Sequence, residues 1–402
     1  MILVIAPLLP LRTGIATYSH KLYSEIGKHY PLLILANKGS SKFYNNKKKL
    51  KIIESWDYNQ LSSFIPLTTK LIKNKKKLLH FQLGYTWIKN PLTSQILTIF
   101  LLLIAKLLLR MKIIVTLHGI VTRKTLDIYF STGKQRKTKH TIMFLHLLYT
   151  TYYKLLVKTT DIIIVHNLKI KRKLIRIVGS KYKKKILIIP HGVDTPPSNK
   201  KITKLRDKEK VYLLFTGFIR RNKGIEEFIE ALNLIDEKIR GKIKVIIAGS
   251  PHIGDDINYY TELKAMIKKY KLEKLIELKI KFIPENELNE IIQKAEVIIL
   301  PYKDYFYEAS GVLARIMGYE KAVICTNIPK FSSELKNGED AIIIPPGDKT
   351  SLVKAIETLV TSRELRLKLA HNLRKKGKLR EWEKIAQKHI KLYLSLTKLG
   401  NP

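Results

Sequence analysis

Short apolar runs recur along the whole chain and alternate with stretches whose apolar residues recur at helical spacing. Fully apolar runs of about four to eight residues are typical of strands buried on both faces of a parallel sheet, with helices as crossovers. The runs form two series, which predicts two doubly wound α/β domains with parallel sheets. The predicted strands are 2–7, 32–37, 78–83, 112–119, 161–167 and 185–190, then 211–217, 244–249, 280–284, 296–301, 322–326 and 341–346.

The two series are separated by segment 191–210, which is rich in Pro, Ser and Lys and lacks apolar periodicity, so we interpret it as a linker. A chain of 402 residues suits two domains of about 150–200 residues each. We predict an N-terminal domain over 1–195, a second domain over 196–380, and a closing helix over 381–402. Ligands of such sheets bind where the strands end, so we expect a site in the cleft between the domains.

The longest apolar run is Ile96–Leu109, which contains Lys106. With about 14 residues it is shorter than the roughly 20 that span a bilayer, and we interpret it as a buried crossover helix. A membrane span and a helix that dips partly into a membrane surface are the alternatives. The first seven residues, MILVIAP, have no basic region and no cleavage site, and they indicate a first strand rather than a signal peptide.

The charge of the chain is strongly positive and uneven. The net charge is +42, and residues 1–200 hold 36 Lys and Arg against 6 Asp and Glu. Such a body favours nucleic acid, an anionic membrane or an anionic substrate as partner, although compositional drift toward Lys also explains part of it. The single cysteine, Cys325, lies in an apolar run, so we expect a core residue, no internal disulfide and a reducing compartment.

The segment Leu300–Asn327 carries the clearest candidate chemistry. A strand ends at Pro301, a polar loop carries Glu308, Ser310 and Gly311 open an apolar helix, and a second strand follows. This order presents a helix N-terminus to an anion beside an acid. The alternative interpretation of Glu308 is an ordinary acid at the start of a helix.

Two further loops follow strands and precede helices. Gly14 would let backbone N–H groups approach a phosphate, unless it only makes a tight turn. In FTGFIRRNKG, Arg220 or Arg221 together with Lys223 could clamp a diphosphate, and a solvated basic loop is the alternative.

His118 ends a strand in VTLHG and is a candidate contact for a reacting group, with a structural histidine as the alternative. We interpret His80, His166 and His191 as capping or core residues. The sequence has no HExxH, no cysteine cluster and no Asp-x-Asp, so we expect no metal and no cofactor.

Seven segments, in chain order, resemble the retaining family-4 glycosyltransferases of the GT-B fold. They are GIATYS, TLHG, IIPHGVD, GFIRRNKG, IIAGSP, LPY…EASGVL and IIIPPGD, and the tail WEKIAQKHIKLYLSL is similar to the family's closing helix. The resemblance implies two Rossmann-like domains, of which the first binds the acceptor and the second a nucleotide-sugar donor, with no metal required. It implies a hexosyltransferase whose acceptor is a glycan or a lipid-linked sugar on an anionic membrane, in the cytoplasm at the inner membrane face.

The resemblance also assigns residues. It implies that His118 lies beside the transferred sugar and that Glu308, the first glutamate of the family's Glu-x7-Glu element, holds the sugar's hydroxyls. The donor-binding residues that it implies are Gly14, Arg220, Lys223, Phe282, Ile283, Ser310, Gly311, Val312 and Leu313. The segment 282–284 would flank the nucleobase, and the loop 123–140 is our candidate for acceptor or membrane contact, with a mobile solvated loop as the alternative.

Arg315 departs from the family pattern. It stands where the second glutamate usually binds the ribose hydroxyls, and an arginine cannot accept their protons. The chain is then either an active, divergent enzyme, which we favour, or a non-catalytic GT-B docking partner of an active glycosyltransferase. A nucleic-acid-binding role is the third hypothesis, but the sequence has no recognised nucleic-acid module.

Overall fold

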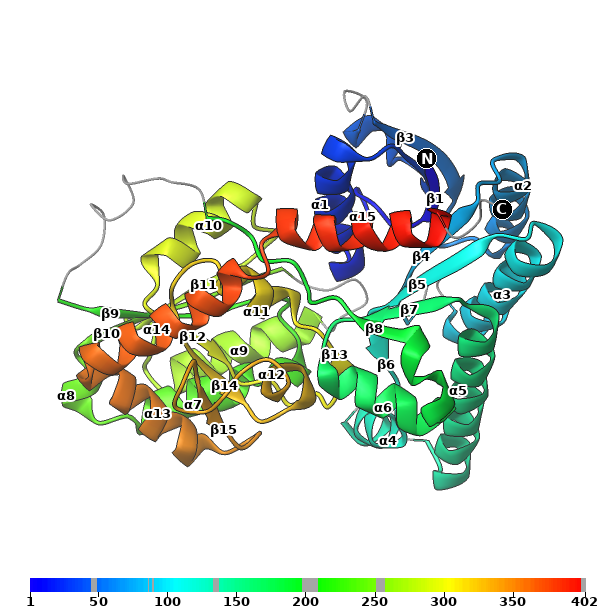
Figure 1. Ribbon diagram of the computed structural model, residues 1–402. Helices are drawn as coiled ribbons and strands as arrows, with labels where there is room; N and C mark the ends of the chain where they lie inside the picture. The colour runs from blue at the N-terminus through cyan, green and yellow to red at the C-terminus, as the bar shows by residue number, and fades with distance from the viewer. Residues whose placement is uncertain are drawn as a thin grey trace. The chain divides into compact units, whose positions relative to one another are not determined.

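The computed structural model describes residues 1–44, 49–85, 87–88, 90–132, 137–196, 209–250 and 257–398. The chain forms two compact units. Unit 1 comprises Met1–Gly192, Phe306–Gly311 and Arg380–Pro402, and unit 2 comprises Val193–Tyr305 and Val312–Leu379. Both are α/β units built on a parallel sheet, as the sequence predicts (Figure 1).

Unit 1 is built on a seven-stranded parallel sheet with the order β3-β2-β1-β4-β5-β7-β8. Its elements are β1 Ile2–Ile5, α1 Gly14–His29, β2 Leu32–Asn37, η1 Ser41–Phe43, β3 Leu50–Trp56, η2 Leu61–Ser63, α2 Phe64–Lys73, β4 Leu78–Leu83, α3 Pro91–Leu103, η3 Ile104–Leu108, β5 Lys112–Leu117, β6 Gly119–Ile120, α4 Arg123–Thr132, α5 Lys139–Thr159, β7 Ile162–Val165, α6 Leu168–Val178, η4 Ser180–Lys185, β8 Ile186–Ile188, β13 Tyr307–Glu308 and α15 Trp382–Lys398.

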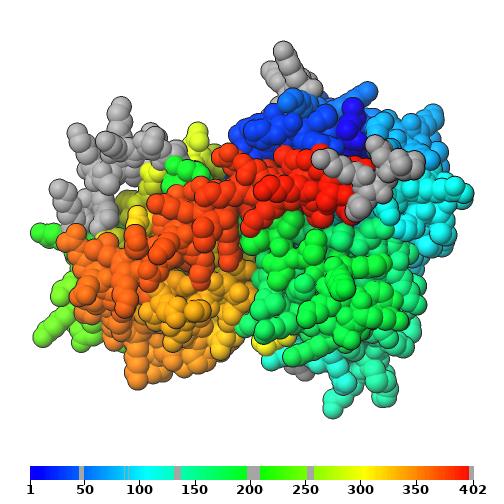
Figure 2. Space-filling model, in the orientation of Figure 1, coloured from blue at the N-terminus to red at the C-terminus, as the bar shows by residue number. Residues whose placement is uncertain are grey.

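Each face of this sheet has its own core. On one face the strands pack against α2, α3, α5 and α6, where Leu67, Leu101, Leu156 and Leu174 are fully buried. On the other face they pack against α1 and α15, through residues such as Tyr393. Figure 2 shows the red C-terminal helix against the blue N-terminal segment, so residues nearly 400 positions apart complete one core.

Unit 2 is built on a six-stranded parallel sheet with the order β11-β10-β9-β12-β14-β15. Its elements are β9 Val211–Thr216, η6 Arg221–Lys223, α7 Ile225–Leu234, α8 Glu237–Arg240, β10 Ile243–Gly249, α9 Ile257–Lys269, β11 Ile276–Ile280, α10 Glu285–Lys294, β12 Val297–Leu300, α11 Gly311–Ile316, β14 Ala322–Thr326, α12 Pro329–Ser332, β15 Ile342–Ile344, α13 Lys349–Thr361 and α14 Arg363–Lys378. One large apolar cluster fills both faces of this sheet, and Cys325 lies fully buried within it, as expected.

In the two parallel sheets, two strands differ from the sequence-based prediction. β3 was not expected, and β11 covers Ile276–Ile280 rather than 280–284. Both strands stand at an edge of their sheet, where one side lacks a neighbouring strand. Their sequences, LKIIESW and IELKI, accordingly mix charged with apolar residues and lack the continuous apolar run that marks a central strand.

For two segments, the structure differs from the interpretation that the sequence suggested. The expected loop 123–140 is helical at both ends, in α4 and at the start of α5, while 133–136 lies outside the described residues. The apolar run 96–109 does form a crossover, between β4 and β5, but only 33% of Pro91–Leu108 is buried. Most of the predicted linker, 197–208, also lies outside the described residues.

Candidate functional site

Each sheet reverses its strand order at one point, and this is where open parallel sheets bind ligands, beyond the carboxyl ends of the strands. In unit 1 the reversal lies between β1 and β4, and in unit 2 between β9 and β12. Several candidate residues follow these strands or their neighbours. Gly14 lies beyond β1, His118 directly follows β5, and Lys223 lies in the loop after β9.

In unit 2, the loop after β9 packs tightly against the loop after β12. Gly224 adopts a left-handed conformation, with φ of 69°, and a side chain there would meet the carbonyl oxygen of Pro301 at 2.0 Å. Only glycine fits both conditions. The close approach places the end of η6, with Lys223, beside the residues that follow Pro301.

Lys223 is held in this loop by an acid and an aromatic ring. Its Nζ lies 3.6 Å from Oδ2 of Asp304 and 3.8 Å from the centre of the Tyr302 ring. Lys330 shares the same carboxylate, donating to Oδ2 at 2.9 Å, and its side chain is only 2% exposed. Two lysines therefore share one aspartate, and the three ionised side chains together carry one excess positive charge.

Burial alone would raise the pKa of Asp304, but Lys330 and Lys223 hold it below its ordinary value. The aspartate is therefore ionised, and it limits the repulsion between the two ammonium groups. A partly buried cation at the strand reversal point, with its side chain already ordered, is suited to an anionic ligand.

Arg221, in the same loop, is bound to helix α9. It donates from Nη2 to Oε1 of Glu262 at 2.6 Å, and its guanidinium lies 4.7 Å from the centre of the Tyr259 ring. The motif alone left open which arginine joins Lys223, and the family resemblance implied Arg220. The contact with Glu262 gives Arg221 a role in holding the loop against α9.

Arg315 is anchored within unit 2 by three different side chains. Its Nε lies 3.5 Å from Oδ2 of Asp194, and its Nη2 lies 3.3 Å from Oε1 of Glu285. Its Nη1 donates to Oδ1 of Asn289, which also accepts from the hydroxyl of Tyr319 at 2.6 Å. The arginine thus joins α11 to α10 and to the segment at the start of unit 2, which is a structural reason for a cation at this position.

The other donor-side candidates lie at 282–283 and 310–313. Phe282 is 56% exposed, and Ile283 is half-buried. Leu313 is buried, and Val312 contributes a methyl group near Gly217. Helix α11, which begins at Gly311 beside the buried Ser310, has only six residues, so its dipole is short.

In unit 1, Glu308 lies next to His118 through a pair of short strands. β13 pairs antiparallel with β6, and this sets Glu308 opposite Gly119, the residue after His118. The hydroxyl of Tyr85 donates to Oε2 of Glu308 at 3.3 Å. A side chain at position 119 would displace that hydroxyl, so glycine leaves room for Tyr85 to reach the carboxylate.

His118 belongs to a chain of hydrogen bonds that sequence reasoning did not find. Nδ1 of His166 lies 3.0 Å from the carbonyl oxygen of Ile189, so Nδ1 carries the hydrogen and Nε2 accepts. His118 then donates from Nδ1 to His166 Nε2 at 3.1 Å. Nε2 of His118 lies 2.8 Å from Oε1 of the Gln82 amide.

Burial, followed by the neighbouring histidines, holds the pKa of His118 well below its ordinary value. A neutral His118 with its hydrogen on Nδ1 requires Gln82 to turn its amide so that the –NH2 group faces Nε2. Both ring nitrogens are then occupied within unit 1. The ring of Tyr18, 4.7 Å away and edge-on, also fixes His118, so the arrangement suits positioning better than proton transfer.

The other two candidate histidines also have structural contacts. His80 is fully buried and bonded to Tyr393 and Thr116, at 2.7 and 2.8 Å. Nδ1 of His191 lies 2.7 Å from the carbonyl oxygen of Gly192. Core hydrogen bonding, the interpretation favoured from the sequence for His80, His166 and His191, agrees with these contacts.

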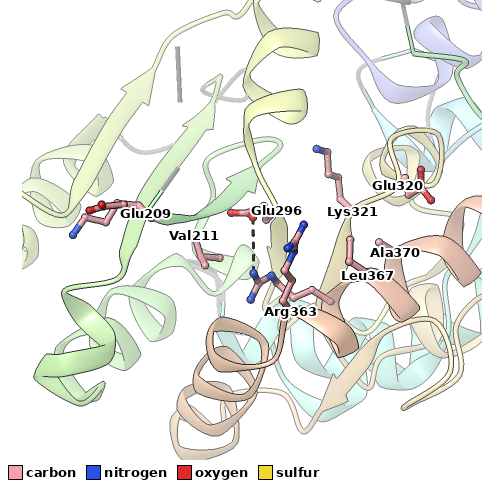
Figure 3. A pocket seen from close by; sticks show the side chains of 10 residues that line it. Glu209, Val211, Glu296, Glu320, Lys321, Arg363, Leu367 and Ala370 are labelled. Atoms are coloured by element: carbon pink, nitrogen blue, oxygen red, sulfur yellow. Dashed lines mark ion pairs between the residues drawn. The ribbon is translucent and has the colours of Figure 1, made fainter. Parts of the chain in front are cut away.

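Unit 2 also has a hollow of about 670 Å³, lined by charged residues (Figure 3). Arg366 pairs with Glu296 at 3.9 Å inside it. Val211 is the first residue of β9 and Lys321 precedes β14, so the hollow lies at the amino ends of the strands. It is therefore at the opposite edge from Lys223. Among the described residues, no group of three or more His, Cys, Asp or Glu is placed to hold a metal ion.

Comparison with known proteins places these features in context. Residues 198–379 match the family model of glycosyl transferases group 1. The alpha-D-kanosaminyltransferase of Streptomyces kanamyceticus is 23% identical over 165 residues, 41% of this chain and 40% of that protein. An uncharacterized glycosyltransferase of Methanocaldococcus jannaschii is 25% identical over 47% of this chain and 46% of that protein. The matches thus span less than half the length of these curated relatives.

The structural likeness covers nearly the whole chain. The Anabaena protein HepE, solved in complex with UDP, aligns with a TM-score of 0.73 over 98% of this chain and 100% of that one, at 14% identity. The fold is therefore that of the GT-B glycosyltransferases, with two parallel-sheet α/β units. The segment that matches the model of glycosyl transferases group 1, residues 198–379, covers most of unit 2.

Proposed function

We propose that this protein is a retaining, metal-independent glycosyltransferase that moves a sugar from a nucleotide-diphosphate sugar to a glycan or lipid-linked acceptor at a membrane surface. The observation that carries the proposal is the Lys223–Asp304–Lys330 cluster at the strand reversal point of a glycosyltransferase group 1 domain. A net positive charge there is what a leaving diphosphate requires. That a structural relative, HepE, was solved with UDP supports a nucleotide as the ligand.

In this function, positive charge develops at the anomeric carbon of the sugar while negative charge develops on the departing diphosphate. Lys223 and Arg220 would stabilise the diphosphate charge, and such preorganised groups supply a large part of the catalytic effect. Glu308 would bind hydroxyls of the sugar, and His118, held in one orientation, would contact the sugar at its ring edge or through its backbone. Gly14 would approach the phosphates.

A screen of common nucleotide sugars, with membrane extract as the source of acceptor, tests this proposal. We expect release of nucleoside diphosphate and transfer of label to the extract for at least one donor. Titration of the purified protein with nucleoside diphosphates supplies the binding measurement. If no nucleoside diphosphate binds at millimolar concentration and no label is transferred, the proposal is wrong.

The second candidate function, a non-catalytic partner that docks on an active glycosyltransferase, was motivated by Arg315. The contacts of Arg315 with Asp194, Glu285 and Asn289 give that residue a role in packing, which is compatible with an active enzyme. The titration separates the two functions, because the docking partner predicts no nucleotide binding at any of the concentrations tested.

A further inference from the structure

Unit 1 exposes large apolar side chains on the outward surfaces of three neighbouring elements. On α3 and η3 they recur at helical spacing, and on α5 they lie in the second and third turns. We call this set the apolar face, and it consists of Leu92, Ile96, Phe100, Leu107, Leu108, Met143, Phe144 and Leu147, each at least 42% exposed. Helix α3 packs against α5, and Figure 1 shows the two helices side by side in unit 1. The residues therefore form one surface.

The opposite sides of the same helices fix their orientation. Leu101, Leu102 and Ala105 are fully buried against the strands, and so are Leu156 and Val157 of α5. By length and composition alone, Pro91–Leu108 could cross a membrane, but one third of it lies in the core of unit 1. A helix anchored in this way presents one side to its surroundings, as an interfacial helix does.

The charge around the apolar face is almost entirely positive. Residues 61–160 hold 17 Lys and Arg and a single acid, Asp127. Exposed cations stand beside the apolar side chains on the same or adjacent elements, including Arg110, Lys139, Lys154 and Lys158. An apolar surface bordered by cations is complementary to an anionic bilayer, whose headgroups attract the cations while the acyl region accepts the apolar side chains.

The place of this face in the fold relates it to the candidate site. Helix α3 follows β4 and α5 precedes β7, so both helices begin at the carboxyl edge of the sheet. Ile96, Phe144 and Leu147 lie near those beginnings, at the edge where His118 also lies. A bilayer in contact with the apolar face would therefore adjoin the acceptor side of unit 1.

We propose that the apolar face inserts into the interfacial region of an anionic lipid bilayer, with Phe100 and Phe144 as its principal anchors. The proposal deepens the proposed function, on which it rests for the identity of the acceptor as a lipid-linked molecule. Membrane contact itself needs no donor and no catalysis. It can therefore be measured separately.

The test is sedimentation of the purified full-length protein with vesicles of phosphatidylglycerol and phosphatidylcholine, compared with vesicles of phosphatidylcholine alone. We expect binding to the anionic vesicles and a drop of about tenfold or more in the partition coefficient for Phe100→Ser/Phe144→Ser. The thermal midpoint should be unchanged, because both side chains are more than half exposed. The matched control is Leu234→Ser/Leu367→Ser, which removes equally exposed side chains from unit 2 and should bind like the parent protein.

A second measurement reports the contact directly. The variant Phe100→Trp should fluoresce more than the parent protein. Lipids that are brominated in their acyl chains should quench this added fluorescence. If vesicles bind but this added fluorescence is not quenched, and the double serine variant binds normally, the proposal is wrong. It is also wrong if the double variant only changes self-association in light scattering, since the face would then join two copies of the chain.

The outcome is independent of the proposed function. Donor hydrolysis measured without vesicles should be equal in the parent protein and in Phe100→Ser/Phe144→Ser. A protein that hydrolyses nucleotide sugars but ignores anionic vesicles would overturn the membrane proposal alone. One that binds vesicles through Phe100 but binds no nucleotide would overturn the proposed function and its lipid-linked acceptor, while the contact itself stands.

Discussion

Lys223 and Asp304 form an ion pair across two loops of unit 2, with 3.6 Å between Nζ and Oδ2. The two residues are 81 positions apart and meet because β9 and β12 are neighbours in the sheet. Asp304 also contacts Lys330, and the ion pair orients the ammonium group of Lys223. We therefore predict that Lys223→Ala lowers turnover by about tenfold or more, because the leaving diphosphate loses a preorganised cation. Initial rates with the donor found in the screen are the measurement.

The control for this variant is Arg221→Ala. Arg221 belongs to the same loop but is paired with Glu262, so its loss should leave turnover within about twofold of the parent rate. Equal losses in the two variants would mean that the loop acts only through its overall charge, and the role assigned to Lys223 would be wrong.

The buried part of this cluster leads to a prediction about stability. Asp304→Asn removes the carboxylate that lies 2.9 Å from the buried ammonium group of Lys330, and removing one partner of a buried pair costs about 3–5 kcal/mol. Lys330→Met should cost less, since Asp304 keeps Lys223 and Asn222 as partners. Urea unfolding of both variants and of the double variant measures this. The double variant should be more stable than Asp304→Asn alone, and the opposite order would contradict the assignment.

A substitution at Gly14 should change the affinity for the donor without changing the stability of the fold. A Cβ atom built on Gly14 meets no atom within 4 Å, so Gly14→Ala should fold normally. If a phosphate approaches the backbone there, the added methyl group should raise the dissociation constant for the donor by about tenfold. Gly338→Ala is the contrast, because its φ of 74° predicts a loss of about 1 kcal/mol in stability but no change in donor binding. Calorimetric titration measures the dissociation constant for the donor, and thermal melts measure the stability.

The buried histidines predict a stability that falls in acid. Burial lowers the pKa of His389 to about 4 and that of His166 to about 3, and it lowers the pKa of His80 as well. In the unfolded chain these groups take up protons near pH 6.5, so stability is complete above that pH and falls as the pH decreases toward the folded values. At pH 5 each such histidine should cost about 2 kcal/mol.

The measurement is the unfolding free energy between pH 7.5 and pH 5. We expect it to decline as the pH falls, with a slope that corresponds to the uptake of several protons on unfolding. His389→Gln should reduce that slope by about one proton. His371→Gln, at a position where the side chain is 71% exposed, should leave it unchanged. A pH-independent stability in this range would show that the histidines are protonated in the fold.

Arg315 stands where the glycosyltransferases that this chain resembles carry a glutamate, and the effect of that acid can be tested. Arg315→Glu would place a carboxylate beside Asp194 and Glu285, which now contact the guanidinium. We expect this variant to lose stability by about 1–3 kcal/mol and to gain no affinity for nucleoside diphosphates. Thermal melts and titration test both expectations, with Arg315→Gln as the uncharged control. A gain in affinity for the glutamate variant would show that this position still faces the ribose.

Much of the fold could be predicted because apolar runs mark central parallel strands. Eleven of the twelve predicted strands overlap structural strands over at least half of their predicted length, and the sequence also placed Gly14 and Gly311 at the starts of helices. The strands of the two parallel sheets that were missed or displaced, β3 and β11, are edge strands with mixed polarity. Periodicity alone does not distinguish such strands from loops.

The candidate site was predictable as a set of loops but not as a set of contacts. The chain order of strands and helices locates Lys223 and His118 beyond strand ends. The partners of these residues, Asp304 for Lys223 and His166 with Gln82 for His118, depend on which strands become neighbours. A lysine at position 330, in the apolar surroundings of IPKF, was a signal that a buried acid must lie nearby, since a buried ammonium group needs a counter-charge.

Helix α15 has a consequence for how the protein is made. Its Tyr393 bonds to His80, and with Ile385 and Ala386 it is buried in the core that α1 forms on one face of the first sheet. During synthesis, residues 1–192 emerge on the order of ten to forty seconds before that helix, at about 5–20 residues per second. For this interval the nascent first unit has a sheet whose apolar surface and buried histidine lack their cover. Helix α15, which is translated after the second unit, therefore completes the core of the first unit.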